Sequence, residues 1–255
     1  MSGKAQDTAN YQVFTIESSF NSEKTVDLRL GVISFNYYED LFSPTITAKL
    51  TVIDGGNVIV SDKSPDGKKE SLYSGLPLRG GERIGIKIQP FGKPPGSDQN
   101  PALDFNSGTT FLYVSKISSL MKEGQREVLT LDLTSRESIT NEFVRVHERF
   151  PRDLTIADSV NKIVKDKLSA ELVDFDQSSN QYGFIGNMKK PFNILVWLAS
   201  KAVDSNKEAG YFFYQTQKGF KFKSISSLIE EGKNSPKSEY TFKSVGNTPL
   251  EYSDD

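Results

Sequence analysis

The sequence predicts an α+β protein in which an antiparallel β-barrel precedes a small helical domain with a β-hairpin. Runs that alternate apolar and polar residues fill residues 11–135, as half-buried strands do. From residue 136 the apolar residues recur at spacings of three and four, which is the period of an α-helix. The stretch GYFFYQTQKGFKFKS, residues 210–224, then returns to strand-like alternation around a glycine-containing turn.

The composition excludes several classes of protein. The chain has 255 residues, with 31 basic and 33 acidic side chains and a net charge of -2, so it lacks the basic excess typical of nucleic-acid binders. It has no cysteine, which excludes disulfides and thiolate metal sites. The first ten residues are polar, without the apolar core of a signal peptide, and no segment has the eighteen apolar residues of a membrane span.

About six strands are predicted before residue 136, with no helix among them. They cover residues 11–20, 25–40, 43–54, 81–90 and a hairpin formed by 109–121 and 127–137 around the link KEGQR. In the second of these, Val26, Leu28, Leu30 and Val32 are expected to share one face. A turn is expected at residues 65–67, and the Pro- and Gly-rich stretch 91–108 is expected to be a long exposed loop.

Three helical segments are expected after residue 135. The first, residues 135–146, places Ile139, Phe143 and Val146 on one face. In the second, which ends near residue 168, Thr155 caps the first turn with Asp158 three residues on. After a polar linker at 169–190, a third helix begins at Pro191. Its broad apolar face is expected to comprise Ile194, Leu195, Trp197, Leu198 and Val203.

The aromatic stretch predicts a two-stranded hairpin with apolar side chains on both faces. Residues 211–214 are all aromatic, and on the returning strand Lys221 and Lys223, which alternate with Phe220 and Phe222, are expected to point outward. A hairpin alone is marginally stable, so we expect this one to rest on the helix before it. Its second aromatic face must be covered either by another layer of the chain or by a partner.

No catalytic, cofactor-binding or metal-binding residue is predicted. His147 is the one histidine, which suits a surface position better than a general base. Gly75 and Gly80 have phosphate-loop spacing, but Gly81 stands where that loop needs lysine. Asp174, Asp176, Ser178 and Asn180 alternate as calcium ligands would, but the loop lacks its glycine and its final glutamate, so a polar linker is the alternative. The lysines and aromatic residues of KGFKFKS are compatible with binding of single-stranded nucleic acid. The favoured alternative is a hairpin whose phenylalanines pack inward and whose lysines face solvent.

The order of these segments resembles the baseplate hub proteins of contractile-tailed phages, a family related to phage late-control proteins and type VI secretion spike proteins. The resemblance covers about residues 25–225 and depends on order and spacing more than on any single motif. Three short motifs carry it: Gly81-Glu82-Arg83-Ile84; Thr155, Ala157, Asp158, Val160 and Ile163 after a proline; and Gly210, Phe213, Gly219 and Phe222 in the hairpin. The acidic residue and serine that the family often has before the third helix are replaced by MKKPF.

The resemblance implies a structural protein that forms a ring, usually a trimer, and has no catalytic centre and no cofactor. It implies a flexible arm at residues 1–10, a tail-tube-like barrel domain at 11–135, a helical domain with a hairpin at 136–229, and an extension with one further strand at 230–255. The implied partners are further copies of the chain, the tail spike, tail tube or tube-initiator proteins and the tape measure protein, with the genome passing through a central channel. The implied location is the tail baseplate of the virion, assembled in the host cytoplasm, without a membrane anchor.

One feature departs from the family and leaves a second function open. Full-length members carry a second barrel-like domain, whereas about thirty residues follow the hairpin here, enough for a helix and the strand EYTFKSV. We therefore expect either a shortened hub or a ring that another chain completes. The alternative function is a carbohydrate-binding module for the host surface, in which Tyr37, Tyr38 and Tyr73 stack on sugar rings.

Overall fold

The structure is a computed structural model that describes residues 10–19, 24–55, 59–60, 69–76, 78–89, 103–106, 110–124 and 126–234. Residues 1–9 of the predicted arm, the turn at 65–67 and the strand EYTFKSV lie outside these residues, while Asn10, the last residue of that arm, begins β1. The strands are β1 (Asn10–Glu17), β2 (Thr25–Asp27), β3 (Val32–Tyr38), β4 (Thr47–Asp54), β5 (Ile59–Val60), β6 (Lys69–Glu70), β7 (Arg83–Gln89), β8 (Leu103–Phe105), β9 (Leu112–Glu123), β10 (Arg126–Ser135), β11 (Arg149–Phe150), β12 (Leu172–Phe175), β13 (Phe184–Ile185), β14 (Tyr211–Thr216) and β15 (Gly219–Ser224). The helices are α1 (Leu72–Gly75), α2 (Arg136–Phe143), α3 (Ile156–Leu168), α4 (Pro191–Ala199) and α5 (Ile225–Asn234).

One large antiparallel sheet dominates residues 10–135, which we call the sheet module. Its strands follow the order β2-β1-β7-β9-β10-β4-β3, with β8 paired to β7. The predicted hairpin is confirmed as β9 and β10, which pair from Glu123 and Arg126 back to Leu112 and Ser135. β9 meets β7 only at Arg83–Tyr113 and Ile84–Leu112, and at this corner the sheet changes direction.

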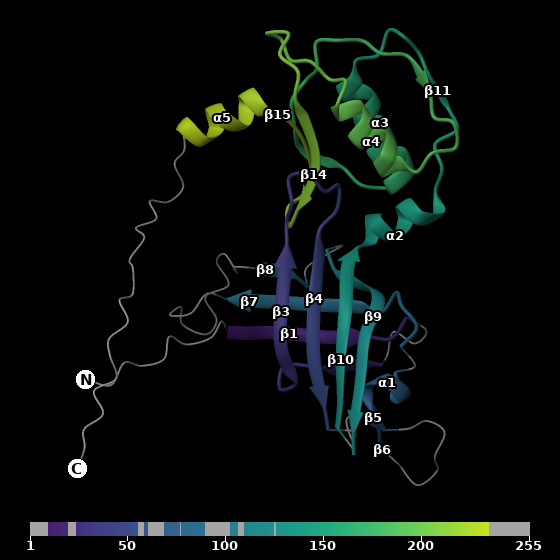
Figure 1. The fold of residues 1–255 in the computed structure, drawn as a ribbon, viewed down its shortest axis with the longest axis vertical. Coiled ribbons are helices and arrows are strands. Elements are labelled where there is room, and N and C mark those ends of the chain that lie inside the picture. Colours follow the sequence, from purple (N-terminus) through teal and green to yellow (C-terminus); the bar gives the residue numbers. More distant parts are fainter. Residues whose placement is uncertain are drawn as a thin grey trace, which may run out of the picture.

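The sheet folds over on itself without closing. In Figure 1 β1 and β7 run across β3, β4 and β10, so the two halves of the sheet face each other. In the described residues no ladder joins β3 to β1 or β2, so the predicted α+β class is confirmed but the closed barrel is not.

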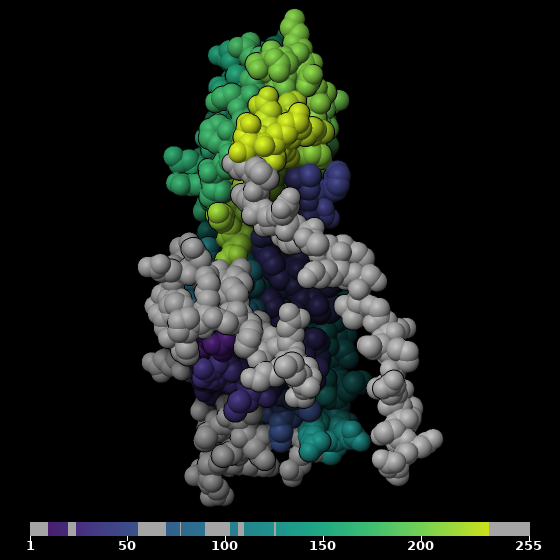
Figure 2. All heavy atoms as spheres, turned by 90° about the vertical axis from the view of Figure 1, so that its left-hand side faces the viewer, coloured from purple at the N-terminus to yellow at the C-terminus, as the bar shows by residue number. Residues whose placement is uncertain are grey.

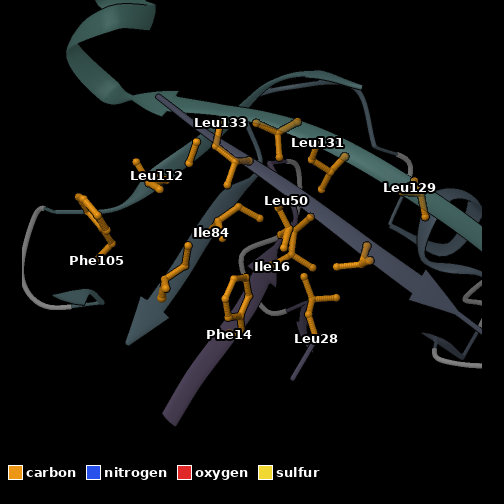
Figure 3. Close-up of a cluster of buried hydrophobic side chains, with 14 of the residues drawn as sticks. Phe14, Ile16, Leu28, Leu50, Ile84, Phe105, Leu112, Leu129, Leu131 and Leu133 are labelled. Atoms are coloured by element: carbon orange, nitrogen blue, oxygen red, sulfur yellow. The ribbon is translucent and has the colours of Figure 1, made fainter. Parts of the chain in front are cut away.

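The space between the two halves is a hydrophobic core. Inward-facing residues of β1, β4, β7, β9 and β10 fill it, and Figure 3 shows side chains from the opposing strands meeting there. Phe14, Leu50, Ile84 and Leu131 are fully buried. Alternation along each strand produces this layer, because successive side chains point to opposite faces of a sheet.

Three predictions in the sheet module were wrong. No helix was predicted before residue 136, but Leu72–Gly75 form α1, whose first turn is capped by Ser71. Residues 25–40 are not one strand, because a turn between Leu28 and Gly31 separates β2 from β3 and leaves Leu30 fully exposed instead of beside Leu28. The stretch 91–108 is not wholly an exposed loop. Its residues 103–105 form β8, and Leu103 and Phe105 are buried against the core.

Residues 136–234, which we call the helical module, have a second hydrophobic core. The helices α3 and α4 pack against one face of a sheet ordered β12-β15-β14. The predicted cap of α3 is confirmed, since Thr155 Oγ1 accepts from the Asp158 N–H at 3.1 Å. A second cap was not predicted: Ser178 Oγ accepts from the Ala157 N–H at 2.9 Å. The domain boundaries at residues 10, 135 and 229 remain predictions, and α5 extends across the last of them.

Three predictions for the helical module need correction. The first helix ends at Phe143, which is 82% exposed, while Val146 lies outside it in a bridge to Lys189. The third helix ends at Ala199, so Val203 is not part of it. The polar linker at 169–190 contains β12 and β13, and β12 pairs in parallel with β15. A four-residue and a two-residue strand carry too little alternation to be distinguished from a linker.

Candidate functional site: interaction surfaces

The residues that resembled catalytic or metal-binding motifs are either exposed or bonded to other protein groups. The His147 side chain is 65% exposed with Glu148 at 4.0 Å, and the described residues contain no group of histidine and carboxylate side chains that could hold a metal. Asp174 and Asp176 bind lysine, Ser178 caps α3, and Asn180 bonds to the backbone of Lys201 and Val203. These four side chains therefore do not form the calcium site that their spacing allowed.

The glycine-rich turn before β7 is held by a buried carboxylate. Glu82 is fully buried and accepts hydrogen bonds from the backbone N–H groups of Arg79, at 2.7 Å, and Gly80, at 3.0 Å. Gly80 and Gly81 have φ angles of 99° and 83°, a region that favours glycine. Glu82 occupies the N–H groups of Arg79 and Gly80, and the Gly81 N–H donates to the Val114 carbonyl at 2.7 Å, so these three groups fix the turn into β7 and are not available to a phosphate.

The tip of the β14–β15 hairpin joins the two modules. Gln215 is buried, and its Oε1 accepts from the Ile46 N–H and the Thr45 hydroxyl, both at 3.3 Å, while its Nε2 donates to Glu137 at 3.2 Å. The backbone N–H of Gln217 donates to Glu39 Oε1 at 2.6 Å. The tip of the hairpin therefore docks on the sheet module of the same chain.

An open cleft of about 380 Å³ lies beside this joint. Its charged lining residues are Arg136, Glu137, Glu171 and Lys218, with the side chains of Phe105 and Phe111 between the modules. The lining carries both positive and negative groups, and Glu137 is already bonded to Gln215 and Arg136. This arrangement offers no convergent set of groups for a particular ligand.

The inner face of the hairpin packs as predicted, on the helix that precedes it. Phe213 stacks on Phe220 with ring centroids 5.3 Å apart, and Phe192 of α4 lies 6.0 Å from Phe220. On the other face, Phe212 meets the edge of Phe42 from the β3–β4 loop at 5.3 Å. Figure 2 shows α5, in yellow, next to blue residues of that loop. Other segments of the chain thus cover part of the second aromatic face.

Lys223 does not point into solvent, and that prediction was wrong. Its side chain is 6% exposed, and its ammonium lies 3.0 Å from Asp174, 3.0 Å from Asp176 and 2.5 Å from Glu231 of α5. Burial alone would lower the pKa of Lys223, but hydrogen bonds to these carboxylates raise it well above the ordinary value. Burial would likewise raise the pKa of Asp174, yet bonds from Lys223 and Lys221 hold that pKa below 3.8.

The two edges of the large sheet differ in their protection. At one edge β2 has three residues, and Asp27 forms a 2.5 Å ion pair with Arg29 beside it. At the other edge β3 has seven residues, VISFNYY, without charge or proline. Short edges and charged side chains discourage pairing with other chains, and no described strand pairs with the outer side of β3, so within the described residues this edge is the more open to a neighbour. Exposed apolar residues accompany it: Leu30, Ile33, Tyr38 and Phe42.

The three tyrosines of the carbohydrate-binding hypothesis are not assembled into a platform. Tyr37 faces the core, 5.4 Å from Phe105, and its hydroxyl donates to Glu39 at 2.7 Å. Its neighbour Tyr38 alternates to the outer face and is 53% exposed, and Tyr73 lies in α1. None of the aromatic contacts among the described residues pairs two of these three rings.

Comparison with solved structures identifies the fold. No family model matches the chain, and no curated protein matches it significantly. The 43 kDa tail protein of prophage MuSo2 from Shewanella oneidensis matches 83% of the chain with a TM-score of 0.50 and 10% identity. The chain has the fold of a phage tail protein.

Two further structures are similar at lower scores. A tail protein from Neisseria meningitidis MC58 matches 84% of the chain at 9% identity and a TM-score of 0.47. An E. coli protein described as a component of the type VI secretion system, with structural similarity to T4 bacteriophage tail proteins, matches 88% at 8% identity and a TM-score of 0.41. The chain spans about half of each structure, at 54%, 51% and 48% of their lengths.

The residues that carried the sequence resemblance have structural roles within this tail-protein fold. Glu82 holds the turn before β7, and Thr155 with Asp158 caps α3. Gly210 and Gly219 flank β14 with φ angles of 122° and 128°. The motifs thus mark turns and caps. The contacts of Gln215 with the sheet module and of Lys223 with its carboxylates correspond to no motif in the sequence. The described helices include none long and apolar enough to cross a membrane.

Proposed function

We propose that this protein is the central hub of a contractile phage tail baseplate. Its copies form a trimeric ring that joins the tail tube above to the cell-puncturing spike below, and the genome passes through the centre without specific binding. The protein works through interfaces alone, as a structural component and not as an enzyme. Its location is the baseplate of the virion, after assembly in the host cytoplasm.

The fold shared with the MuSo2 tail protein, over 83% of this chain, is the observation that carries this proposal. The surface supports it, because the uncharged edge of β3 and its exposed apolar residues suit permanent contact with other subunits. The polar side chains described above cap helices, hold a turn or join the two modules, and they do not converge on a ligand. This is what we expect of a protein that acts through contacts with other subunits. Tube or tube-initiator proteins and the tape measure protein are its further partners.

Light scattering coupled to size-exclusion chromatography tests the proposal on the full chain. We expect a trimer at micromolar concentration, and a larger complex when the spike protein encoded in the same genome is added. A monomer at all concentrations that does not bind the spike would overturn the hub function.

A further inference from the structure

The hydrophobic core of the sheet module is incomplete along its edge strand β3. On the neighbouring strand β4, Leu50 and Val52 are fully buried. On β3, Val32, Phe35 and Tyr37 pack against the same core but are only partly buried. Burial therefore falls from one strand to the next, as we expect where no further strand of the described residues covers the edge.

The backbone of β3 also has an unpaired side within the described residues. β3 pairs with β4 alone, so alternate N–H and C=O groups along its seven residues point away from the sheet. It is the longest described strand that ends a sheet, and the next longest, β14, is bonded to the sheet module through Gln215 and Gln217. A long unpaired edge accepts an extended segment through main-chain hydrogen bonds.

The predicted strand EYTFKSV, residues 239–245, lies outside the described residues, and its sequence fits this edge. Pro236 precedes it and Gly246 follows it, as is typical of the ends of a strand. Alternation places Tyr240 and Phe242 on one side and the two charged residues on the other. The aromatic side suits the half-buried row of β3, and the charged side suits solvent.

The helix α5, which precedes this segment, projects from the molecule. The ion pair of Glu231 with Lys223 and a 3.3 Å bond from Ser227 Oγ to Asp176 hold α5 on the hairpin sheet. Figure 1 shows α5 projecting sideways, away from the axis along which the two modules are stacked. Residues 235–238 link α5 to the segment and span at most roughly 14 Å. A strand carried on a projecting arm is placed for exchange between neighbouring subunits.

We infer that residues 239–245 of one copy add to the β3 edge of the next copy as a further strand. Main-chain hydrogen bonds supply the pairing, and the aromatic side of the segment covers Phe35 and Tyr37. Each copy donates one strand and accepts one, so the contact is head-to-tail and closes into a ring when the rotation permits. The inference rests on the ring of the proposed function and specifies one of its contacts.

Site-specific cross-linking tests the contact, and the absence of cysteine makes it free of background. Two full-length variants, Asn36→Cys on the exposed side of β3 and Lys243→Cys in the segment, are treated with a short bis-maleimide, separately and after co-expression. We expect cross-linked dimers after co-expression only, because one cysteine comes from the edge and the other from the donated strand. Leu120→Cys, an exposed position on β9, is the matched control and should not cross-link with Lys243→Cys.

The double variant Asn36→Cys/Lys243→Cys distinguishes exchange between copies from pairing within one chain. Exchange gives covalent dimers and trimers on a denaturing gel. A cross-linked monomer alone would show that each chain covers its own edge, and it would overturn the inference.

A proline tests whether the segment pairs as a strand. Thr241→Pro removes a backbone N–H and leaves the aromatic and charged residues in place, so we expect self-association to weaken at least about tenfold in sedimentation equilibrium. Ser253→Pro, in the same tail beyond the segment, is the matched control and should stay within about twofold of the natural protein. Far-ultraviolet circular dichroism checks that both variants keep the fold. Equal effects of the two prolines would overturn strand pairing.

The outcomes separate this contact from the proposed ring. A trimer that persists while the co-expressed variants fail to cross-link would overturn the strand exchange and leave the ring standing. A chain that stays monomeric at all concentrations would overturn both.

Discussion

Lys223 joins β15 and α5, which are consecutive in the sequence, to β12, which lies 49 residues earlier at Asp174. Its ammonium binds Asp174 in β12, Asp176 just after it and Glu231 in α5, while its own strand, β15, lies between them. A charged group this buried is stable only while its partners remain in place. The residue therefore links the second face of the hairpin sheet to α5.

Replacing Lys223 by methionine tests this link. Lys223→Met removes the buried cation that Asp174, Asp176 and Glu231 share and leaves Asp174 with Lys221 alone, so we expect the free energy of unfolding at pH 7 to fall by on the order of 3 kcal/mol. Urea denaturation followed by circular dichroism measures it. Lys221→Met is the matched control: its side chain is 24% exposed with one partner at 3.3 Å, and it should lose less than about 1 kcal/mol. Equal losses would contradict the role of Lys223.

The same cluster predicts how stability depends on acidity. The pKa of Asp174 is lowered in the folded protein, so its contribution is present above pH 3.8 and is lost as the pH falls through its folded value. The raised pKa of Lys223 keeps that charge up to and beyond pH 10.5, so the lysine adds no slope between these limits. We expect the free energy of unfolding to decline below about pH 4, and less steeply in Lys223→Met. Identical acid profiles for the two proteins would exclude the cluster as the cause.

Asn141 supplies a cap that α4 lacks in its own sequence. Lys190 precedes the helix without a side-chain cap, and the buried Asn141 of α2 accepts the Phe192 N–H at 2.8 Å instead. Asn141→Ala should therefore cost about 1–2 kcal/mol in urea denaturation. Asn193→Ala, at an exposed position of α4, should change stability by less than about 0.5 kcal/mol. The reverse order of effects would show that the cap is unimportant.

At the scale of elements, the β14–β15 hairpin connects the two modules at a second place, beside the contact of α2 with β9 and β10. Its inner face packs on α4, its outer face meets Phe42, and its tip inserts Gln215 among Thr45, Ile46 and Glu137. The aromatic residues supply the apolar packing, and the amide of Gln215 supplies the hydrogen bonds at the tip. The modules should therefore unfold together while these contacts are intact.

The single tryptophan provides a test of this coupling. Trp197 lies in α4, so its fluorescence reports on the helical module, whereas far-ultraviolet circular dichroism reports on both modules. The two thermal transitions should coincide in the natural protein and separate by about 3 °C or more in Gln215→Leu, which leaves the Ile46 N–H and Glu137 without their partner. Gln177→Leu, at an exposed position, should leave them coincident. Coincident transitions in Gln215→Leu would contradict the coupling.

Elements with many residues in one period were predictable, and elements fixed by distant partners were not. The strands β4, β7, β9 and β10, the helix α3 and the hairpin follow their patterns because each buries one face against a core. The predicted helix face of Ile139, Phe143 and Val146 failed because α2 packs little apolar surface and buries Asn141 instead. Lys223 was placed in solvent by alternation alone, since no local pattern shows that three carboxylates will gather around it.

At the scale of the whole molecule, the open edge of β3 is the feature that most favours assembly. Ile33→Lys places a charge on this edge, and we expect it to weaken self-association about tenfold in sedimentation velocity, because a buried lysine would lose its hydration. Stability of the monomer should be unchanged, since Ile33 is 56% exposed. Leu120→Lys on the outer side of β9 serves as the control. An unchanged oligomer would show that β3 lies outside the interfaces.

Within the described residues, the chain crosses between the modules once, where Ser135 runs into Arg136. A single crossing would act as a swivel, but the hairpin adds contacts from Phe212 to Gln217, a span of roughly 15 Å along a strand. Contacts spread over such a lever arm oppose torque as well as bending. We therefore expect a force applied at one end of the chain to reach the other end with little twisting of one module against the other.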